Sequence, residues 1–198
     1  MLKLFYMSVS DVPYEIPTDI SEYRKNKIIS ARSEKAKRVL TAAALVLKAG
    51  FASLGIEEKD VSYAALENGK PYAVSHPEIH FSLSHSETMA VAAFSDSPVG
   101  IDCERVNREI PPLLLKRFFP REAEDFKDEP LLLWVAGESL TKLSGEGIFG
   151  AKSRTRIPVF EENKAKFDKI TLEKIIIEDN LTVVSTEKYE NAEIMKVC

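Results

Sequence analysis

Two carboxylates, Asp102 and Glu104, lie two residues apart in VGIDCERV, an otherwise apolar and β-branched stretch. In a strand, residues i and i+2 point to the same face, roughly 6.5–7 Å apart. Negative charges at this spacing repel unless a cation lies beside them, and Mg²⁺, which takes one or two protein carboxylates, is one solution. The alternative is a solvated strand face whose acids are neutralised by Arg105 or Arg108. We expect the small Gly100 to leave room for a ligand.

A third acid, Glu138, lies four residues before Lys142 in WVAGESLTKLSGEG, so a helix places both side chains on one face. Taken alone, they form an ordinary helix ion pair worth about 0.3–0.5 kcal/mol. Ser84 and His85 lie where the stretch FSLSHS turns back. The histidine is either structural or a donor to a phosphate, and no Ser-His-Asp or Cys-His arrangement makes Ser84 a nucleophile.

A basic cluster occupies the N-terminal part of the sequence, against only Glu22 and Glu34. Its members are Arg24, Lys25, Lys27, Arg32, Lys35, Lys37 and Arg38. The cluster is either a solvated helix face or a local positive patch that binds a phosphate group.

Strands and helices must position these residues. The predicted helices cover 19–31, 33–50, 111–119, 121–126 and 129–147, and the predicted strands cover 2–9, 79–86, 89–95, 99–106, 156–160, 172–179 and 180–186. Thr18 or Asp19 is expected to cap the first helix and Ser33 the second, which Gly50 should end. Pro130 should lie in the first turn of the last helix, and Gly145 should close it. The closely spaced strands between residues 79 and 106 indicate an antiparallel meander. In the last of them Val99, Ile101 and Cys103 should face the core.

The composition is that of a globular chain with a substantial core. Of the 198 residues, 44% are hydrophobic and 29% are charged. The formal net charge of −4 argues against a nucleic-acid-binding protein. Two cysteines without metal-type spacing, and no stretch typical of a signal peptide or a membrane span, predict a cytoplasmic protein.

The sequence resembles the 4'-phosphopantetheinyl transferase superfamily in five stretches that occur in the same order. They are GKPY, FSLSHS, VGIDCE, RFFPREAEDF and WVAGESLTKLSGEGI. The resemblance is to its larger, pseudo-twofold branch, typified by the activator of surfactin synthetase. That family has a G-K-P turn, an S-H-S strand end, a G-I-D-x-E strand, an F-F-x-x-x-E segment and a W-x-x-K-E-x-x-x-K helix ending in G-x-G. The resemblance covers roughly residues 23–148, and the D-x-E and W…E…K blocks are its specific parts.

The resemblance implies an α+β fold of two similar halves, 1–98 and 99–198, related by a pseudo-twofold axis, with antiparallel sheets packed against helices. A cleft between the halves would hold coenzyme A. The implied enzyme moves the phosphopantetheine arm of coenzyme A to a serine of an apo acyl or peptidyl carrier protein. It depends on Mg²⁺, with Mn²⁺ as an alternative, and releases adenosine 3',5'-bisphosphate. We expect a monomer with no membrane or nucleic-acid partner.

The resemblance also implies roles for individual residues. Asp102, Glu104 and Glu138 would bind the metal, Glu138 would also be the general base, and Lys142 would neutralise phosphate charge. The coenzyme A site would comprise Arg24, Lys27, Arg38 and His85 around the 3'-phosphate, Lys70 and Ser84 along the nucleotide, and Lys142 at the phosphate charge.

One position departs from the family pattern, because Gly137 replaces the lysine that usually precedes the helix glutamate. Glycine within a helix costs about 1 kcal/mol relative to alanine. The change is either the loss of a peripheral contact, which we favour, or a change in activity or carrier choice. Two other functions stay open: a non-catalytic relative that binds coenzyme A or a carrier, and a Mg²⁺-dependent phosphoesterase.

Overall fold

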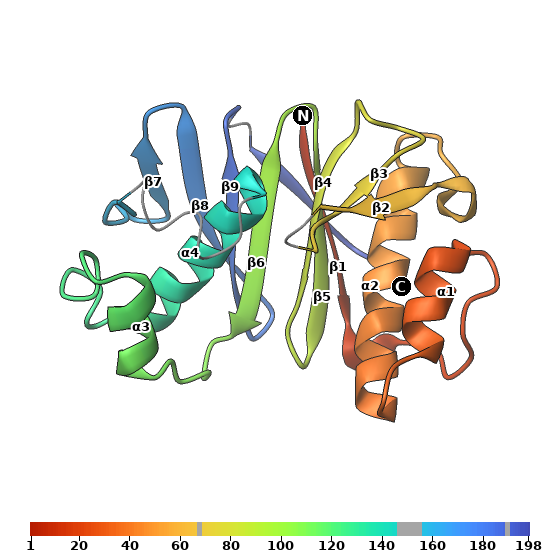
Figure 1. Ribbon diagram of the computed structural model, residues 1–198, viewed down its shortest axis with the longest axis horizontal. Coiled ribbons are helices and arrows are strands. Elements are labelled where there is room, and N and C mark those ends of the chain that lie inside the picture. Colours follow the sequence, from red (N-terminus) through yellow and green to blue (C-terminus); the bar gives the residue numbers. More distant parts are fainter. Residues whose placement is uncertain (67–68, 146–155, 189–190) are drawn as a thin grey trace.

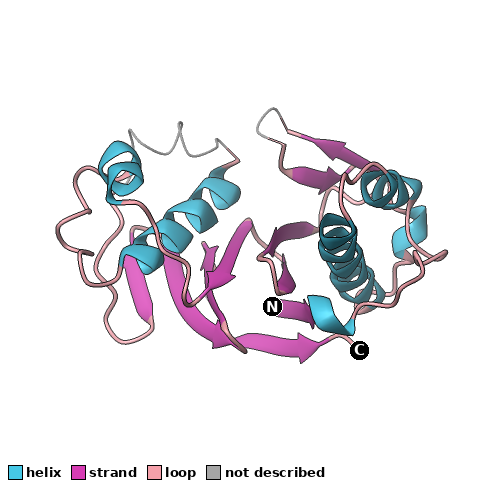
Figure 2. Ribbon diagram, turned by 90° about the horizontal axis from the view of Figure 1, so that it is seen from below, coloured by secondary structure: helices cyan, strands magenta, loops and turns pink. Residues whose placement is uncertain are grey.

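The computed structural model describes residues 1–66, 69–145, 156–188 and 191–198. In this part of the chain, two four-stranded sheets lie beside each other and share an apolar core, and each sheet packs against helices (Figure 1). Seen from below, the two groups of helices lie at opposite ends of the molecule (Figure 2). The α+β class predicted from the sequence is thereby confirmed.

The first sheet has the strand order β10-β1-β5-β4. Its strands are β1 (Leu2–Ser8), β4 (His80–His85), β5 (Met89–Ser95) and β10 (Ala192–Lys196). Helices α1 (Glu22–Ile29) and α2 (Glu34–Ala52) lie over this sheet, and the buried face of α2 forms a core with it. Ser33 caps α2 as predicted, because its hydroxyl accepts a hydrogen bond from the Ala36 amide at 3.1 Å.

The second sheet has the order β6-β9-β8-β7 and is antiparallel throughout. Its strands are β6 (Val99–Arg105), β7 (Lys164–Phe167), β8 (Ile170–Ile177) and β9 (Asn180–Thr186). Helix α4 (Pro130–Ser144) packs on β6 and β9, and α3 (Pro112–Phe118) packs on α4. As predicted, proline opens α4 and Gly145 ends it in the left-handed conformation, with a φ of 70°.

Short elements complete the described chain. The 3-10 helices η1 and η2 cover Val9–Asp11 and Glu58–Asp60, and strands β2 (Tyr63–Ala65) and β3 (Pro71–Ala73) form a small hairpin. Among the described residues, no helix combines the length and apolar character that crossing a bilayer requires.

The core between the sheets is formed by one face of β6 and the facing strands of the first sheet. Val99, Ile101 and Cys103 belong to this cluster with Leu4 and Val91, as the alternation of the sequence predicts. The other face of β6, which carries Gly100, Asp102 and Glu104, therefore turns toward the α4 side. This orientation is what brings the acids of the strand and the helix together.

The expected meander is wrong at its third strand. Strands β4 and β5 pair as a hairpin, but β6 leaves that sheet and pairs with β9. Side chains join the edges of the two sheets instead: the Ser82 hydroxyl accepts from the Ile101 amide at 3.1 Å, and the Ser84 hydroxyl accepts from the Cys103 amide at 3.4 Å.

Several predicted boundaries also differ. Ser21, rather than Thr18 or Asp19, precedes α1, and α2 continues beyond Gly50, whose missing side chain leaves space for the ring of Phe94. Residues 121–126 form turns rather than a helix, and 156–160 form no strand.

Strand β10 was not predicted and comes from the C-terminal part of the sequence. It pairs parallel with β1 in the first sheet, so the two sheets do not divide cleanly at one point of the chain. The boundary between residues 98 and 99 and the pseudo-twofold axis both stay predictions.

Candidate functional site

The candidate site lies where the end of β4, the middle of β6 and the last turns of α4 meet. Lys142 Nζ donates to Asp102 Oδ1 at 2.7 Å and to the Ser84 hydroxyl at 2.9 Å. The Ser84 hydroxyl in turn donates to the same oxygen, Asp102 Oδ1, at 2.7 Å. Three residues that are far apart in the sequence therefore form a closed triangle of hydrogen bonds.

The second oxygen of Asp102 has no such partners. The residue is only 6% exposed, and its Oδ2 is buried without a hydrogen-bond partner. Most buried polar atoms in proteins are hydrogen-bonded, and a buried carboxylate oxygen without a partner is costly. An atom of this kind is a ready ligand for a cation.

Glu138 lies one helical turn before Lys142 on α4, as predicted. Burial raises the pKa of the Glu138 carboxyl, and the negative charge of Asp102 raises it further, against the opposing charges of Lys142 and Arg108. The two carboxyls are thus close enough to interact through their charges. A cation bound between them would offset the repulsion between the two negative charges.

Glu104 has a different partner. It forms an ion pair with Arg108, whose guanidinium also lies 6.0 Å from the ring centroid of Trp134. Arg108 therefore neutralises one of the strand acids, as the alternative interpretation of the D-x-E pattern expected. Among the described residues, no three histidine, cysteine or acidic side chains are grouped so that they could hold a metal ion.

The expectation that Gly100 leaves room for a ligand is wrong. A Cβ atom at this position would lie 2.0 Å from the Ser139 carbonyl oxygen and 2.6 Å from the Leu143 amide nitrogen. The missing side chain lets the backbone of α4 approach β6, and the Ser139 hydroxyl donates to the Gly100 carbonyl at 3.2 Å. This close approach carries Lys142 to Asp102.

Lys70 and His85 lie near this triangle. Lys70 Nζ donates to the Lys142 carbonyl and, at 3.3 Å, to the Val99 carbonyl, and burial together with the charge of Lys142 lowers its pKa to about 8. His85 is exposed at the end of β4, yet the surrounding protein and the charge of Lys142 lower its pKa, against the effect of Asp102.

Arg38 lies in a separate groove of about 480 Å³, whose lining also includes Lys35, Glu87 and Glu178. Its Nη2 donates to the carbonyls of Val9 at 2.8 Å and Ser10 at 3.2 Å. The guanidinium, which extends from the first turns of α2, is thus already engaged by the backbone of η1.

Arg24 is buried beside two stacked aromatic rings, 5.2 Å from the ring centroid of Tyr23 and 5.0 Å from that of Tyr63. Its Nε and Nη2 are buried without hydrogen-bond partners, and burial lowers its pKa. Lys27 is exposed and lies 4.9 Å from the ring of Tyr23. The predicted phosphate-binding residues therefore occupy different settings. Ser84 and Lys142 bond to Asp102, His85 interacts with its charge, and Lys70 bonds to the backbone of Lys142.

The sequence analysis did not predict that the ring of Phe119 packs against Gly137. A Cβ atom there would lie 2.1 Å from Cζ of Phe119, so this ring occupies the space where a side chain of residue 137 would begin. The adjacent residues FF in the sequence were the only signal that could have suggested this packing.

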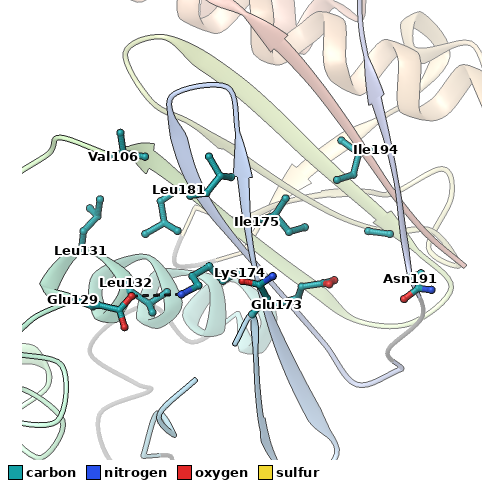
Figure 3. Close-up of a pocket in the computed structure, with 13 residues that line it drawn as sticks. Val106, Glu129, Leu131, Leu132, Glu173, Lys174, Ile175, Leu181, Asn191 and Ile194 are labelled. Carbon is teal, nitrogen blue, oxygen red and sulfur yellow. Dashed lines mark hydrogen bonds and ion pairs between the residues drawn. The ribbon is translucent and has the colours of Figure 1, made fainter. Parts of the chain in front are cut away.

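A larger groove, of about 750 Å³, lies away from these residues (Figure 3). Apolar side chains from β8, β10 and the start of α4 line it, and an ion pair between Lys174 and Glu129, 3.5 Å long, crosses it. None of the predicted site residues belongs to its lining.

Comparisons with known proteins agree with the resemblance predicted from the sequence. The chain is 33% identical over 124 residues to the 4'-phosphopantetheinyl transferase Sfp of Bacillus subtilis strain 168, covering 58% of this chain and 55% of that protein. It is 32% identical over 130 residues to psf-1 of Bacillus pumilus, covering 61% and 55%, and 25% identical over 189 residues to gsp of Aneurinibacillus migulanus, covering 83% and 77%.

Both of these relatives carry the same enzyme name as Sfp. The chain spans about half the length of the first two relatives. No protein-family model matches it.

Proposed function

We propose that this chain, a sequence relative of 4'-phosphopantetheinyl transferases, moves the phosphopantetheine arm of coenzyme A to a serine of an apo carrier protein. The serine oxygen forms a bond to the phosphorus that bears pantetheine. The bond from this phosphorus to the bridging oxygen of the pyrophosphate breaks, which releases adenosine 3',5'-bisphosphate. The observation that supports this proposal best is the buried, unpartnered Oδ2 of Asp102 at a junction that also holds Lys142 and Glu138.

Asp102 and Glu138 supply the carboxylate oxygens that a divalent cation prefers, although the described acids do not form a three-residue cluster. Asp102 Oδ2 has no hydrogen-bond partner, and both burial and the charge of Asp102 disfavour the ionised form of Glu138. Mg²⁺, with Mn²⁺ as the alternative, commonly takes one or two carboxylates and completes its shell with water and substrate phosphate oxygens. Such an ion supplies charge stabilisation to a pyrophosphate. Glu104 is the third proposed ligand, and Arg108 competes for it.

Glu138 is the proposed general base for the carrier serine. A carboxyl whose pKa is raised toward neutral pH accepts a proton more effectively than an ordinary glutamate. Because a carboxylate bound to a cation is a poorer base, both direct transfer and transfer through a water molecule are compatible with this position. Lys142 and Lys70 hold positive charge where the pyrophosphate gains negative charge.

The remaining cations of the predicted set are proposed to bind the adenosine side of coenzyme A. His85 is the nearest of them to the triangle. Arg38 lies in the smaller groove, and Arg24 and Lys27 lie on α1. In this assignment Arg24, whose Nε and Nη2 have no hydrogen-bond partner, requires its pocket to open toward the ligand.

The substitution Asp102→Asn tests the proposal. The amide keeps the shape of the side chain but removes its charge, so we expect transfer to fall about 100-fold or more. The measurement is the mass of a panel of apo acyl and peptidyl carriers after incubation with coenzyme A and Mg²⁺. Asp125→Asn, which removes a surface ion pair with Arg156, is the control and should transfer normally. Normal transfer by Asp102→Asn would refute the site assignment.

The same assay separates the two alternative functions. A non-catalytic relative binds coenzyme A without changing the mass of any carrier. A Mg²⁺-dependent phosphoesterase releases free phosphopantetheine when no carrier is present, whereas a transferase needs the carrier.

A further inference from the structure

We propose that Ser139 and Ser185 are positioning residues that hold Lys142 in the candidate site. The two residues form a buried serine pair, which fixes α4 on β6 and β9 and thereby sets the point from which the lysine side chain extends. This inference rests on the proposed function, because Lys142 is the proposed partner of the substrate phosphate. Both serines lie outside the predicted set of site residues.

The buried serine pair lies in an otherwise apolar layer. Ser139 on α4 and Ser185 on β9 are both 0% exposed. Ala136 and Leu140 of the same helix and Val183 of the same strand belong to the apolar core that these elements share. A buried hydroxyl is costly unless it is hydrogen-bonded, so the bonds of the pair must offset the burial of two polar groups in this layer.

The two hydroxyls connect three elements. The Ser139 hydroxyl donates to the Gly100 carbonyl of β6 at 3.2 Å, and its oxygen lies 2.9 Å from the Ser185 hydroxyl oxygen. The Ser185 hydroxyl donates to the Ser139 carbonyl of α4 at 3.0 Å. Each hydroxyl has a single proton, so this arrangement uses both protons on the backbone of a neighbouring element. The pair therefore joins α4 to β6 and β9 to α4.

The contact with β6 is too close for any residue larger than glycine. A Cβ atom at Gly100 would lie 2.7 Å from the Ser185 hydroxyl oxygen, as well as 2.0 Å from the Ser139 carbonyl oxygen. Hydrogen bonds are directional, so at such a contact they fix both the height and the rotation of the helix, whereas apolar contacts are non-directional. Helix α4 is thus held in one register on β6.

This register determines where Lys142 lies. Ser139 precedes Lys142 by three residues, and Gly100 precedes Asp102 by two residues on the same face of β6. The 2.7 Å bond from Lys142 Nζ to Asp102 Oδ1 therefore joins the same helix and strand as the serine pair, one helical turn further along. A slip of α4 by one residue would move the lysine by about 1.5 Å along the helix axis and turn it by about 100°.

Two hydroxyl deletions test the inference. Ser139→Ala removes the bond to β6, and Ser185→Ala removes the bond from β9 to α4. Alanine is a better helix former than serine, so the first change does not weaken the helix itself. Both changes should let α4 shift and let the bond between Lys142 and Asp102 open more often. The measurement is the rate at which an amine-reactive ester modifies Lys142, followed by peptide mass spectrometry.

We expect Lys142 to react about two- to tenfold faster in both variants, which is the change in population that the loss of one buried hydrogen bond produces. Lys48 of α2, which pairs with Asp19, is the reference within each sample and should react at the wild-type rate. Transfer to an apo carrier at saturating coenzyme A should fall about tenfold, because a small misplacement of a binding group slows a reaction strongly.

The same helix offers a matched control. Thr141 is 4% exposed, and its hydroxyl donates to the Glu138 carbonyl within α4 at 2.9 Å. Thr141→Val removes a buried hydroxyl and keeps the shape of the side chain, but it leaves the bonds from α4 to β6 and β9 intact. This variant should react with the ester and transfer like the wild type. All proteins are compared at a temperature at which circular dichroism shows them to be folded.

Each outcome is decisive. Faster modification of Lys142 together with slower transfer in both serine variants supports the inference. Unchanged modification in both, faster modification with normal transfer, or an equal effect of Thr141→Val overturns it. If Ser139→Ala does not fold, Ser185→Ala decides, because it leaves the sequence of α4 unchanged. If the wild-type protein transfers to no carrier, the proposed function fails, and the modification rates still decide whether the serine pair positions Lys142.

Discussion

Lys70 brings a positive charge to the junction of the β2–β3 hairpin, β6 and α4. It donates to the carbonyls of Val99 and Lys142, so its ammonium group is fixed by backbone oxygens from two elements of the second half of the chain. Burial and the charge of Lys142 together lower its pKa to about 8 from an ordinary value of 10.5. This residue therefore links the stability of the fold to pH.

Between pH 8 and 10.5, the folded chain releases a proton from Lys70 that the unfolded chain keeps. The unfolded state then binds more protons, so this residue makes the free energy of unfolding rise with pH across the window. We expect the wild type to gain stability relative to Lys70→Met between pH 8 and pH 10, as measured by urea unfolding. Lys70→Arg, which stays charged, should follow the methionine variant. Parallel pH curves for all three proteins would contradict the assigned pKa.

The sequence predicted the residue types of the site better than their partners. The strand face of Asp102 and the helix face of Glu138 and Lys142 followed from spacing alone, because strand and helix periods fix which side chains share a face. The bond between Ser84 and Asp102 could not be predicted in this way, since it joins the edge strands of two different sheets.

At the scale of the element, helix α4 carries residues of the candidate site and is also in very close contact with its neighbours at two glycines. Ser139 and Leu143 meet β6 at Gly100, and the ring of Phe119 packs on Gly137. Both glycines are required by packing. Glycine in place of the family lysine at position 137 therefore changes the packing of α4 and also removes a positive charge.

The packing of α4 predicts an unusual effect of Gly137→Ala. Alanine normally stabilises a helix relative to glycine by about 1 kcal/mol. Here the new methyl group would lie 2.1 Å from Cζ of Phe119, so we expect a net loss of about 1–2 kcal/mol in the free energy of unfolding. In a Phe119→Leu background the same change should be neutral or stabilising. A stabilising effect in the wild-type background would show that the ring moves without cost.

The elements that sequence reasoning missed share one physical cause. Local patterns gave the cap at Ser33, the proline start of α4 and the end of α4 at Gly145, because these signals act within one turn. The partners of β6 and β10 depend on contacts between distant segments, which periodicity cannot report.

At the scale of the whole molecule, β10 closes the first sheet with residues from the other end of the sequence. It pairs parallel with β1 from Leu2 opposite Ala192 to Tyr6 opposite Lys196, and Val197 donates to the Tyr6 carbonyl at 2.8 Å. The alternation of a strand then directs the amide of Glu193 toward β1 and the amide of Ile194 outward.

This alternation predicts unequal effects of two neighbouring proline substitutions. Glu193→Pro removes an amide that faces β1, whereas Ile194→Pro removes one that faces outward. We expect Glu193→Pro to lower the free energy of unfolding by about 1–2 kcal/mol more than Ile194→Pro, as measured by urea unfolding. Equal effects, or a larger effect at Ile194, would show that the strand is paired in another way.

The position of β10 also bears on how the chain is made. Residues 192–196 are synthesised after the other strands that the structure describes, although they cover the β1 edge of the sheet that contains residues 2–8. Until then the nascent chain exposes an unpaired strand edge, which is a site for association with other chains. The β1 edge therefore stays open to association with other chains from the synthesis of residues 2–8 until residues 192–196 have followed.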